Sequence, residues 1–182
     1  MLYLVSDTHF NEDPTISSFY GPDFFSSSEA YMTYTTRRWK DKIKCADTVI
    51  VVGDAGDPYV FNDLPGHKIL VRGNHDIYNT DLYSAFDKVV NHIYLEESGV
   101  RILVEHILGS SNIEADIVIC GHSHQVECYR YLYDNKTIIY ALINLLGYEP
   151  RTLQELLDST YHNWLYDLLK IREIIINDTT WE

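Results

Sequence analysis

Basic side chains are scarce in this sequence. Only 14 of its 182 residues are lysine or arginine, against 27 aspartates and glutamates, which gives a formal net charge of −13. Such a surface repels the phosphates of long nucleic acids, so we expect no binding to duplex nucleic acid. A small anionic substrate is still permitted, because bound cations can make a single pocket locally positive on an acidic protein.

Cysteines are also few, and long apolar runs are absent. Cys45, Cys120 and Cys128 form no C-x-x-C pair, which favours reduced thiols over a disulfide framework. The first apolar run is short and is followed at once by Asp7, with neither a basic leader nor a stretch long enough to cross a membrane. We therefore expect a cytoplasmic protein that makes no membrane contact.

Neither proline nor glycine is abundant, and no segment has a low-complexity composition or the character of a linker. With 46% apolar and 23% charged residues, the composition is that of a globular protein. A chain of this length suffices for one domain with a hydrophobic core and is short for two. We expect a single domain that spans residues 1–182.

Helical patterns alternate with short apolar runs in the first part of the chain, and hairpins follow. We expect helices at 26–43, with a capping box at Ser26 and Glu29, and at 80–90. Strands are predicted at 2–6, 47–52, 67–72 and 116–120, and hairpin strands at 92–97, 100–105, 126–133 and 136–144. This order predicts an α/β protein whose sheets are partly parallel and partly antiparallel.

A second capping box lies near the C-terminal end of the sequence. Thr152 and Glu155 have the spacing that begins a helix, and leucines then recur at helical intervals up to about Lys170. This apolar stripe indicates core packing. A last strand is predicted at 171–176.

Polar residues of one chemical kind follow the apolar strands. They are Asp7 and His9 in SDTHF, Asp54 and Asp57 in GDAGD, Asn74, His75 and Asp76 in GNHD, His106 after RILVE, and His122 and His124 in GHSH. Carboxylate, imidazole and amide groups are ligands for manganese, iron, cobalt, nickel and zinc. Each motif alone is compatible with an ordinary turn, because glycine, aspartate and asparagine suit turns. Because each set follows a predicted strand, their joint occurrence favours a metal site over unrelated turns.

The ordered set D-x-H, G-D-x-x-D, G-N-H-D and G-H-x-H, with a further histidine before the last motif, resembles the calcineurin-like metallophosphoesterases. The resemblance extends from residue 2 to about residue 150, and SDTHF together with GYEPRTLQEL is most similar to small bacterial and phage members. It implies a four-layer α-β-β-α sandwich of two mixed sheets. It also implies a phosphoesterase that acts on phosphodiester or phosphomonoester bonds.

The resemblance further implies two divalent metal ions, with manganese the first candidate and iron, nickel, cobalt or zinc as alternatives. By motif, the first metal would be bound by Asp7, His9, Asp54 and His124, and the second by Asp54, Asn74, His106 and His122. Asp54 would then bridge the two ions. Two cations about 3.5–4 Å apart clamp phosphate oxygens and activate a water as a hydroxide nucleophile.

A proton must also reach the leaving oxygen. His75 neighbours the ligand Asn74 without being assigned as a ligand itself, so it is the expected general acid. Asp76 or Asp57 could orient a histidine from behind, and the spacing does not distinguish between them.

Two departures from the family pattern bear on function. Pro58 and Tyr59 stand where the protein phosphatases of this superfamily have arginine and glycine, and Arg72 does not replace that arginine by position. A protein phosphatase is therefore disfavoured. His106 lacks the proline that usually follows it by two residues in small relatives, and His92 is the only plausible substitute.

We expect a small phosphate ester as the substrate. The alternatives are a non-catalytic scaffold on the same fold, which the presence of His75 and of every ligand disfavours, and a nuclease on single-stranded ends, which the negative charge disfavours. No feature indicates the oligomeric state or decides between diester and monoester.

Overall fold

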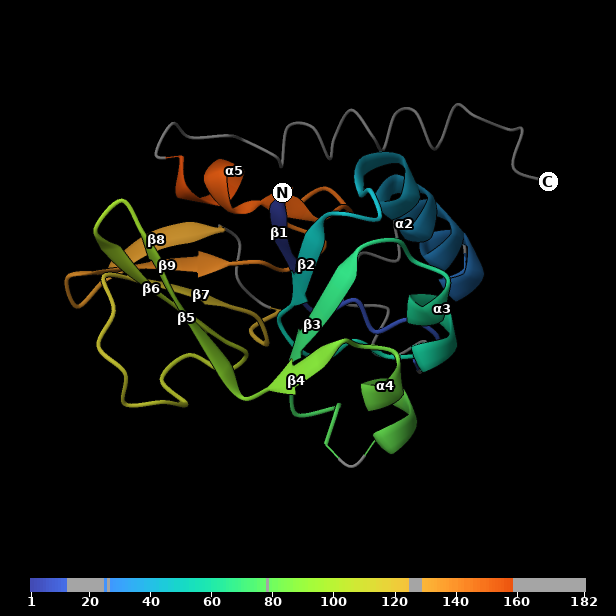
Figure 1. Ribbon diagram of the computed structural model, residues 1–182, viewed down its shortest axis with the longest axis horizontal. Helices are drawn as coiled ribbons and strands as arrows, with labels where there is room; N and C mark the ends of the chain where they lie inside the picture. Colours follow the sequence, from blue (N-terminus) through green and yellow to red (C-terminus); the bar gives the residue numbers. More distant parts are fainter. Residues whose placement is uncertain (13–24, 26, 78, 125–128, 159–182) are drawn as a thin grey trace.

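The computed structural model describes residues 1–12, 25, 27–77, 79–124 and 129–158, and these form two five-stranded sheets with helices beside the first (Figure 1). Both sheets combine parallel and antiparallel strands. The predicted α/β sandwich of two mixed sheets is therefore confirmed.

The first sheet has the strand order β10-β1-β2-β3-β4. Its strands are β1 (Leu2–Val5), β2 (Thr48–Val51), β3 (His67–Val71), β4 (Lys88–Val90) and β10 (Arg151–Thr152). Strands β1 to β4 are parallel, and β10 is antiparallel to β1. The loops after β1, β2 and β3 therefore leave from the same edge of the sheet, and these loops carry the first three polar motifs.

The second sheet has the strand order β5-β6-β7-β9-β8. Its strands are β5 (His92–Glu97), β6 (Val100–Glu105), β7 (Ile117–Cys120), β8 (Arg130–Tyr133) and β9 (Lys136–Tyr140). Strand β7 is parallel to both β6 and β9, while the outer strands are antiparallel to their neighbours. Because β6 and β7 are parallel, the loops that carry the remaining histidines also leave from one edge.

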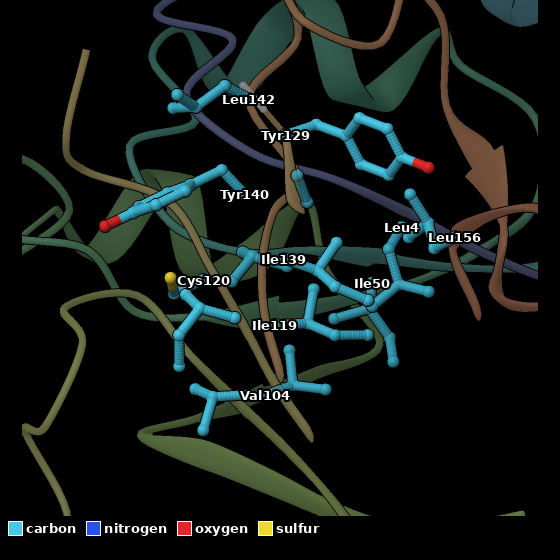
Figure 2. Close-up of a cluster of buried hydrophobic side chains, with 14 of the residues drawn as sticks. Leu4, Ile50, Val104, Ile119, Cys120, Tyr129, Ile139, Tyr140, Leu142 and Leu156 are labelled. Atoms are coloured by element: carbon cyan, nitrogen blue, oxygen red, sulfur yellow. The ribbon is translucent and has the colours of Figure 1, made fainter. Parts of the chain in front are cut away.

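A hydrophobic core lies between the two sheets. Leu4 and Ile50 of the first sheet belong to the same buried cluster as Val104, Ile119 and Ile139 of the second (Figure 2). Each of these side chains is at most 1% exposed. Burying an aliphatic side chain of this size stabilises a fold by about 1.5–3 kcal/mol, so this core fixes how the two sheets face each other.

Helices cover the other face of the first sheet. They are α2 (Ser28–Lys42), α3 (Pro58–Asn62) and α4 (Thr80–Ser84), and Figure 1 shows all three on the side away from the second sheet. Trp39 of α2 and Phe61 of α3 are fully buried, with ring centroids 6.1 Å apart. Within the described ranges, no helix combines the length and the apolar character that crossing a bilayer requires.

Two helix predictions need correction. Helix α2 is capped by Ser27, whose side chain accepts a hydrogen bond from the Ala30 backbone, so it begins later than the predicted box at Ser26. The predicted helix 80–90 is wrong in its second half, because α4 ends at Ser84 and Lys88–Val90 is the edge strand β4. Pairing with β3 and the β-branched pair of valines outweigh the helical pattern there.

The C-terminal capping box is confirmed, since Thr152 and Glu155 exchange the two expected hydrogen bonds at the start of α5 (Leu153–Leu157). The helix ends at Leu157, however, with Asp158 as its cap, so the predicted helical pattern is interrupted there. The rest of that prediction, and the strand 171–176, lie outside the described residues.

Both predicted hairpin turns are confirmed. Ser98 and Gly99 have φ of 53° and 79°, and Asp134 and Asn135 have φ of 47° and 61°. Two successive residues in the left-handed region match the twist of a tight antiparallel hairpin. In the second hairpin β9 ends at Tyr140, earlier than the predicted residue 144, because the next residues turn to pair with Ser6 after β1.

Glu149, from the GYEPR segment, forms ion pairs with helix α2 and with strand β10. Its carboxylate lies 3.0 Å from Lys42 and 3.0 Å from Arg151, and it also pairs with Arg38. Lys42 and Arg151 contact Glu155 as well, at 3.6 and 3.5 Å. This segment is therefore a structural fastening between α2 and α5.

Glu149→Ala should destabilise the fold strongly, because it leaves three cationic groups around a mostly buried position without their shared partner. We expect a loss of about 3 kcal/mol in the free energy of unfolding, measured by urea denaturation. Asp41→Ala is the matched control, since its pair with Arg37 is exposed, and it should cost about 0.5 kcal/mol or less. Equal effects of the two substitutions would contradict the central role of Glu149.

Candidate metal centre

The polar motifs meet where strands of both sheets end. Asp7 and His9 follow β1, Asp54 follows β2, Asn74 and His75 follow β3, His106 follows β6, and His122 and His124 follow β7. Ligand types separated by more than a hundred residues in sequence are thereby gathered at one place. Carboxyl ends of parallel strands are where open α/β sheets commonly place their functional groups.

One group of possible ligands consists of Asp7, His9 and His124, whose ligand atoms lie within 4.8 Å of one another. The Asp7 carboxylate is 3.2 Å from Nε2 of His124 and 3.9 Å from Nε2 of His9. Asp7 and His9 are almost fully buried. These are three of the four residues predicted for the first metal, and the fourth, Asp54, has its Oδ2 atom 3.8 Å from Nε2 of His9.

A second group consists of Asp54, His106 and His122, again within 4.8 Å. Nε2 of His106 is 3.3 Å from Oδ2 of Asp54 and 3.1 Å from Oδ1 of Asn74. The structure thus brings together all four residues predicted for the second metal, His106 included. His92, the alternative to His106, is an exposed residue at the start of β5.

Asp54 lies between the two groups. Its Oδ2 atom is 3.3 Å from Nε2 of His106 and 3.8 Å from Nε2 of His9. Its Oδ1 atom accepts a hydrogen bond from the backbone N–H of His75 at 2.9 Å. One carboxylate oxygen therefore faces ligands of both groups, and the other is held by the chain.

The backbone is strained at four of these residues. Asp7, His9, Asp54 and His122 have φ of 57°, 41°, 51° and 67°. The left-handed region is unfavourable for residues with a side chain, and such strain concentrates at functional sites. Hydrogen bonds between the loops hold it, since Asp7 N–H donates to Gly53 O and His9 N–H donates to Asp54 O, each at 3.0 Å.

Glycines precede the ligands for a steric reason. A Cβ atom at Gly73 would lie within 3 Å of the Asp54 carboxylate, and one at Gly121 would lie within 3 Å of the Asp7 carboxylate. The glycines of G-N-H-D and G-H-x-H therefore make room for ligands of other motifs. The same residues look like turn glycines in the sequence.

Asp76 and Asp57 have other tasks than the predicted orientation of a histidine. The buried Asp76 carboxylate accepts hydrogen bonds from the backbone N–H groups of Asp54, Ala55 and Gly73, at 2.9, 3.0 and 2.7 Å. It therefore ties the loop after β2 to the loop after β3. Asp57 caps α3 through the Tyr59 N–H at 2.8 Å.

His106 is oriented by a backbone carbonyl. Its Nδ1 lies 2.8 Å from Val52 O, and because a carbonyl can only accept, Nδ1 carries the proton. Nε2 is then directed at Asp54 and Asn74. A second hydrogen bond of this kind fixes the ring of a metal-binding histidine, so the proline missing after His106 is not needed to place it.

Without metal, the centre contains acids and bases whose pKa values are strongly shifted. Burial would raise the pKa of Asp54, but the hydrogen bond and charge of His106 outweigh it and lower that pKa to about 2. Burial would lower the pKa of His106, yet Asp54 and Asp7 raise it to about 9. Burial raises the pKa of Asp7 to about 6 and lowers that of His124 to about 4. A proton on His106 therefore neutralises part of the carboxylate charge near pH 7.

Sequence reasoning missed Glu12. Its Oε2 atom is 2.5 Å from Nδ1 of His9 and 3.4 Å from Nδ1 of His75. A spacing of three residues from His9 is the only signal for it, and in a chain with 27 acidic residues that spacing is not distinctive.

His75 stands at the rim of the centre. Its side chain is 39% exposed, while the ring of His9 lies edge-on to it with centroids 5.0 Å apart. Its backbone N–H donates to Asp54, and its ring, although it contacts Glu12, remains exposed enough to reach a bound molecule. Arg72, on the same loop, donates instead to the Asn91 side chain at 3.0 Å.

Metal binding should compete with the proton on His106. Because the pKa of His106 in the metal-free protein is raised to about 9, metal affinity should increase with pH up to that value, by at most about tenfold per pH unit. Calorimetry in buffers of different ionisation enthalpy should detect proton release at pH 7.5. His106→Gln should abolish that release, and His92→Gln should not change it. Affinity independent of pH between 7 and 9 would contradict the coupling.

The chain matches the calcineurin-like phosphoesterase superfamily domain over residues 1–141. An uncharacterized protein of Methanocaldococcus jannaschii is 25% identical over 165 residues, which cover 84% of this chain and 86% of the relative. A solved protein of unknown function from Aquifex aeolicus superposes with a TM-score of 0.67 at 23% identity, covering 85% of this chain and 96% of that one, and shows the same fold. The superfamily match includes every motif that meets at the centre. The chain therefore belongs to the calcineurin-like phosphoesterase superfamily.

Proposed function

We propose that this protein is a dinuclear metal-dependent phosphoesterase that hydrolyses small phosphate monoesters or diesters. The observation that carries the proposal is the position of Asp54, whose Oδ2 faces His9 of one ligand group and His106 of the other. A carboxylate between two sets of imidazoles would be able to hold two adjacent cations, the kind of pair that clamps phosphate oxygens and activates water.

The residues present fit divalent metals. Buried Asp7 and Asp54 each lie within ligand distance of two imidazoles, and the glycines beside them leave the space that a Cβ would fill. Mixed nitrogen and oxygen donors suit manganese, iron, cobalt, nickel and zinc. We assign one ion to Asp7, His9, Asp54 and His124, and the other to Asp54, Asn74, His106 and His122. When bound, such ions neutralise phosphate oxygens and activate water for attack on phosphorus.

The chain itself has three tasks in this reaction. Val52 O fixes which nitrogen of His106 faces the centre, and Asp76 holds the loop of Asp54 to the loop of His75. His75, at the rim, donates a proton to the leaving oxygen. Proton donation from this place is possible because the side chain is exposed while its backbone is fastened.

Phosphate recognition rests on the bound cations. Pro58 and Tyr59 occupy the place of the protein phosphatase arginine, and Arg72 is engaged with Asn91. Without a dedicated guanidinium, discrimination between ester types should be modest, so we propose a small or flexible substrate.

Asp54→Ala should abolish hydrolysis with every metal, because Asp54 would hold both ions. Elemental analysis of the reconstituted protein should give two metals per chain, and clearly fewer in the variant. Asp57→Ala is the control, because this carboxylate caps α3 and should mainly cost about 1 kcal/mol of stability. Activity is assayed on nitrophenyl mono- and diesters with manganese, nickel, cobalt, iron and zinc.

Three results would count against this proposal. A saturating value of one metal per chain, or none, would contradict the role of Asp54 as a ligand shared by two ions. Equal losses for Asp54→Ala and Asp57→Ala, with both folds intact by circular dichroism, would remove the special place of Asp54. Two bound metals without hydrolysis of any ester would favour the scaffold.

His75→Ala should depress hydrolysis of alkyl esters more than hydrolysis of nitrophenyl esters. An alkoxide needs a proton to leave, whereas nitrophenolate leaves as an anion, and general acids contribute about 10²–10⁴-fold. The measurement compares kcat/KM for both ester types in metal-loaded protein, with metal content as a check. A uniform loss across leaving groups would exclude His75 as the acid.

A further inference from the structure

We infer that Glu12 is a positioning residue that sets both His9 and His75 by accepting from their Nδ1 atoms, so that their Nε2 atoms serve the metal centre. The inference rests on the proposed function for its catalytic consequence. It names the group that aligns the general acid, a part that the D-x-H, G-D-x-x-D, G-N-H-D and G-H-x-H motifs do not contain.

One oxygen of Glu12 contacts both rings. Oε2 lies 2.5 Å from Nδ1 of His9 and 3.4 Å from Nδ1 of His75. The two rings meet edge to face, with centroids 5.0 Å apart and an interplanar angle of 90°. The glutamate side chain is 22% exposed, and the His9 side chain is 1% exposed. A partly buried carboxylate thus joins a metal ligand to the residue at the rim.

The turn that follows His9 holds Glu12 in this place. Glu12 N–H donates to His9 O at 3.2 Å, which closes the turn, and Asn11 within it has φ of 56°. The Asn11 side chain donates to Asp57 at 2.7 Å. Phe10 is fully buried and pairs with Gly56. The turn is therefore clamped to the loop of Asp54, and Glu12 is placed by the same loop that places the bridging carboxylate.

The other carboxylates near His75 are engaged elsewhere. Asp57 accepts from Tyr59 N–H and from Asn11, and Asp76 accepts from three backbone N–H groups. Asp54 faces the ligand groups. Among these, Glu12 is the acidic side chain within ion-pair distance of Nδ1 of His75.

This contact decides which nitrogen of His75 faces the substrate. An acceptor at Nδ1 keeps a proton there, which leaves Nε2 as the second donor of the imidazolium. In the proposed reaction the Nε2 proton passes to the leaving oxygen as the phosphorus–oxygen bond breaks. His75 is then neutral and retains its Nδ1 proton, which is directed at the Glu12 carboxylate. Without Glu12 the ring could rotate or adopt the other tautomer.

The same contact orders His9. With its proton on Nδ1 toward Glu12, the unprotonated Nε2 faces Asp7 and Asp54, at 3.9 and 3.8 Å. A carboxylate behind a metal-binding histidine typically improves metal affinity by about 10–100-fold. Glu12 should therefore influence both the affinity of one ion and the alignment of the acid.

The test compares Glu12→Ala and Glu12→Gln with Glu96→Gln, which removes an exposed charge of β5. Nitrogen-15 correlation spectra of the full chain, with and without Zn²⁺, distinguish Nδ1–H from Nε2–H rings. We expect Nδ1–H for His9 and His75 in the wild type. Glu12→Ala should convert His75 to Nε2–H and weaken binding of one Zn²⁺ by about 10–100-fold.

At saturating metal, Glu12→Ala should lower kcat for alkyl esters more than for nitrophenyl esters. In a His75→Ala background it should leave the ratio between the two esters unchanged, because the aligned group is already gone. Glu12→Gln keeps one acceptor oxygen and should fall between wild type and Glu12→Ala. Glu96→Gln should match the wild type in every measurement.

Unchanged tautomers and unchanged Zn²⁺ affinity in Glu12→Ala would overturn the inference. So would a loss of kcat that is equal for both ester types at full metal occupancy. If the wild type hydrolyses no ester, the proposed function fails, but the tautomers and the Zn²⁺ affinity still decide whether Glu12 positions the two rings.

Discussion

The centre depends on the burial of the Asp54 carboxylate at the seam between the two sheets. A buried charge is costly unless it is paired and hydrogen-bonded, and here the imidazoles of His106 and His9 and the backbone N–H of His75 lie around it. The partners come from both sheets, since Asp54 follows β2 and His106 follows β6. Each ligand group contains residues from both sheets, so its assembly depends on the shared apolar core, to which Ile50, Val104 and Ile119 belong, as well as on the loops.

The unfavourable backbone conformations lie at the ligands, whereas the hydrogen bonds that stabilise them join different loops of the fold. Left-handed backbone at Asp7, His9 and Asp54 is unfavourable locally, and such conformations persist only where the surroundings determine them. The support consists of hydrogen bonds between loops, above all those to the Asp76 carboxylate. Asp76 thereby holds two ligand loops together. The GYEPR segment has a similar structural role, because its ion pairs connect α2 to α5.

The sequence was most informative for the metal ligands, because histidines and carboxylates directly after buried strands have few other roles. Asp7, His9, Asp54, Asn74, His106, His122 and His124 are grouped in the structure as their ligand chemistry after buried strands predicts. It was least informative where a common residue acts through its position in space. Glu12 is one acid among many, Asp76 needed the three backbone groups around it, and 88–90 became a strand because β3 offered an edge. The motifs predict the donors, while the contacts that aim them arise only in the folded chain.

The position of β1 inside its sheet, between β10 and β2, has a consequence for how the centre is assembled. The strand is synthesised before its neighbour β10, which lies almost 150 residues later, and Ser6 beside the ligand Asp7 exchanges backbone hydrogen bonds with Ala141 and Ile143. Contacts across so many residues form late in folding, because a long loop must first be closed. A nascent chain therefore exposes Asp7 and His9 long before they can be placed. The site takes its shape only when nearly all of the described chain has emerged and the two sheets have docked.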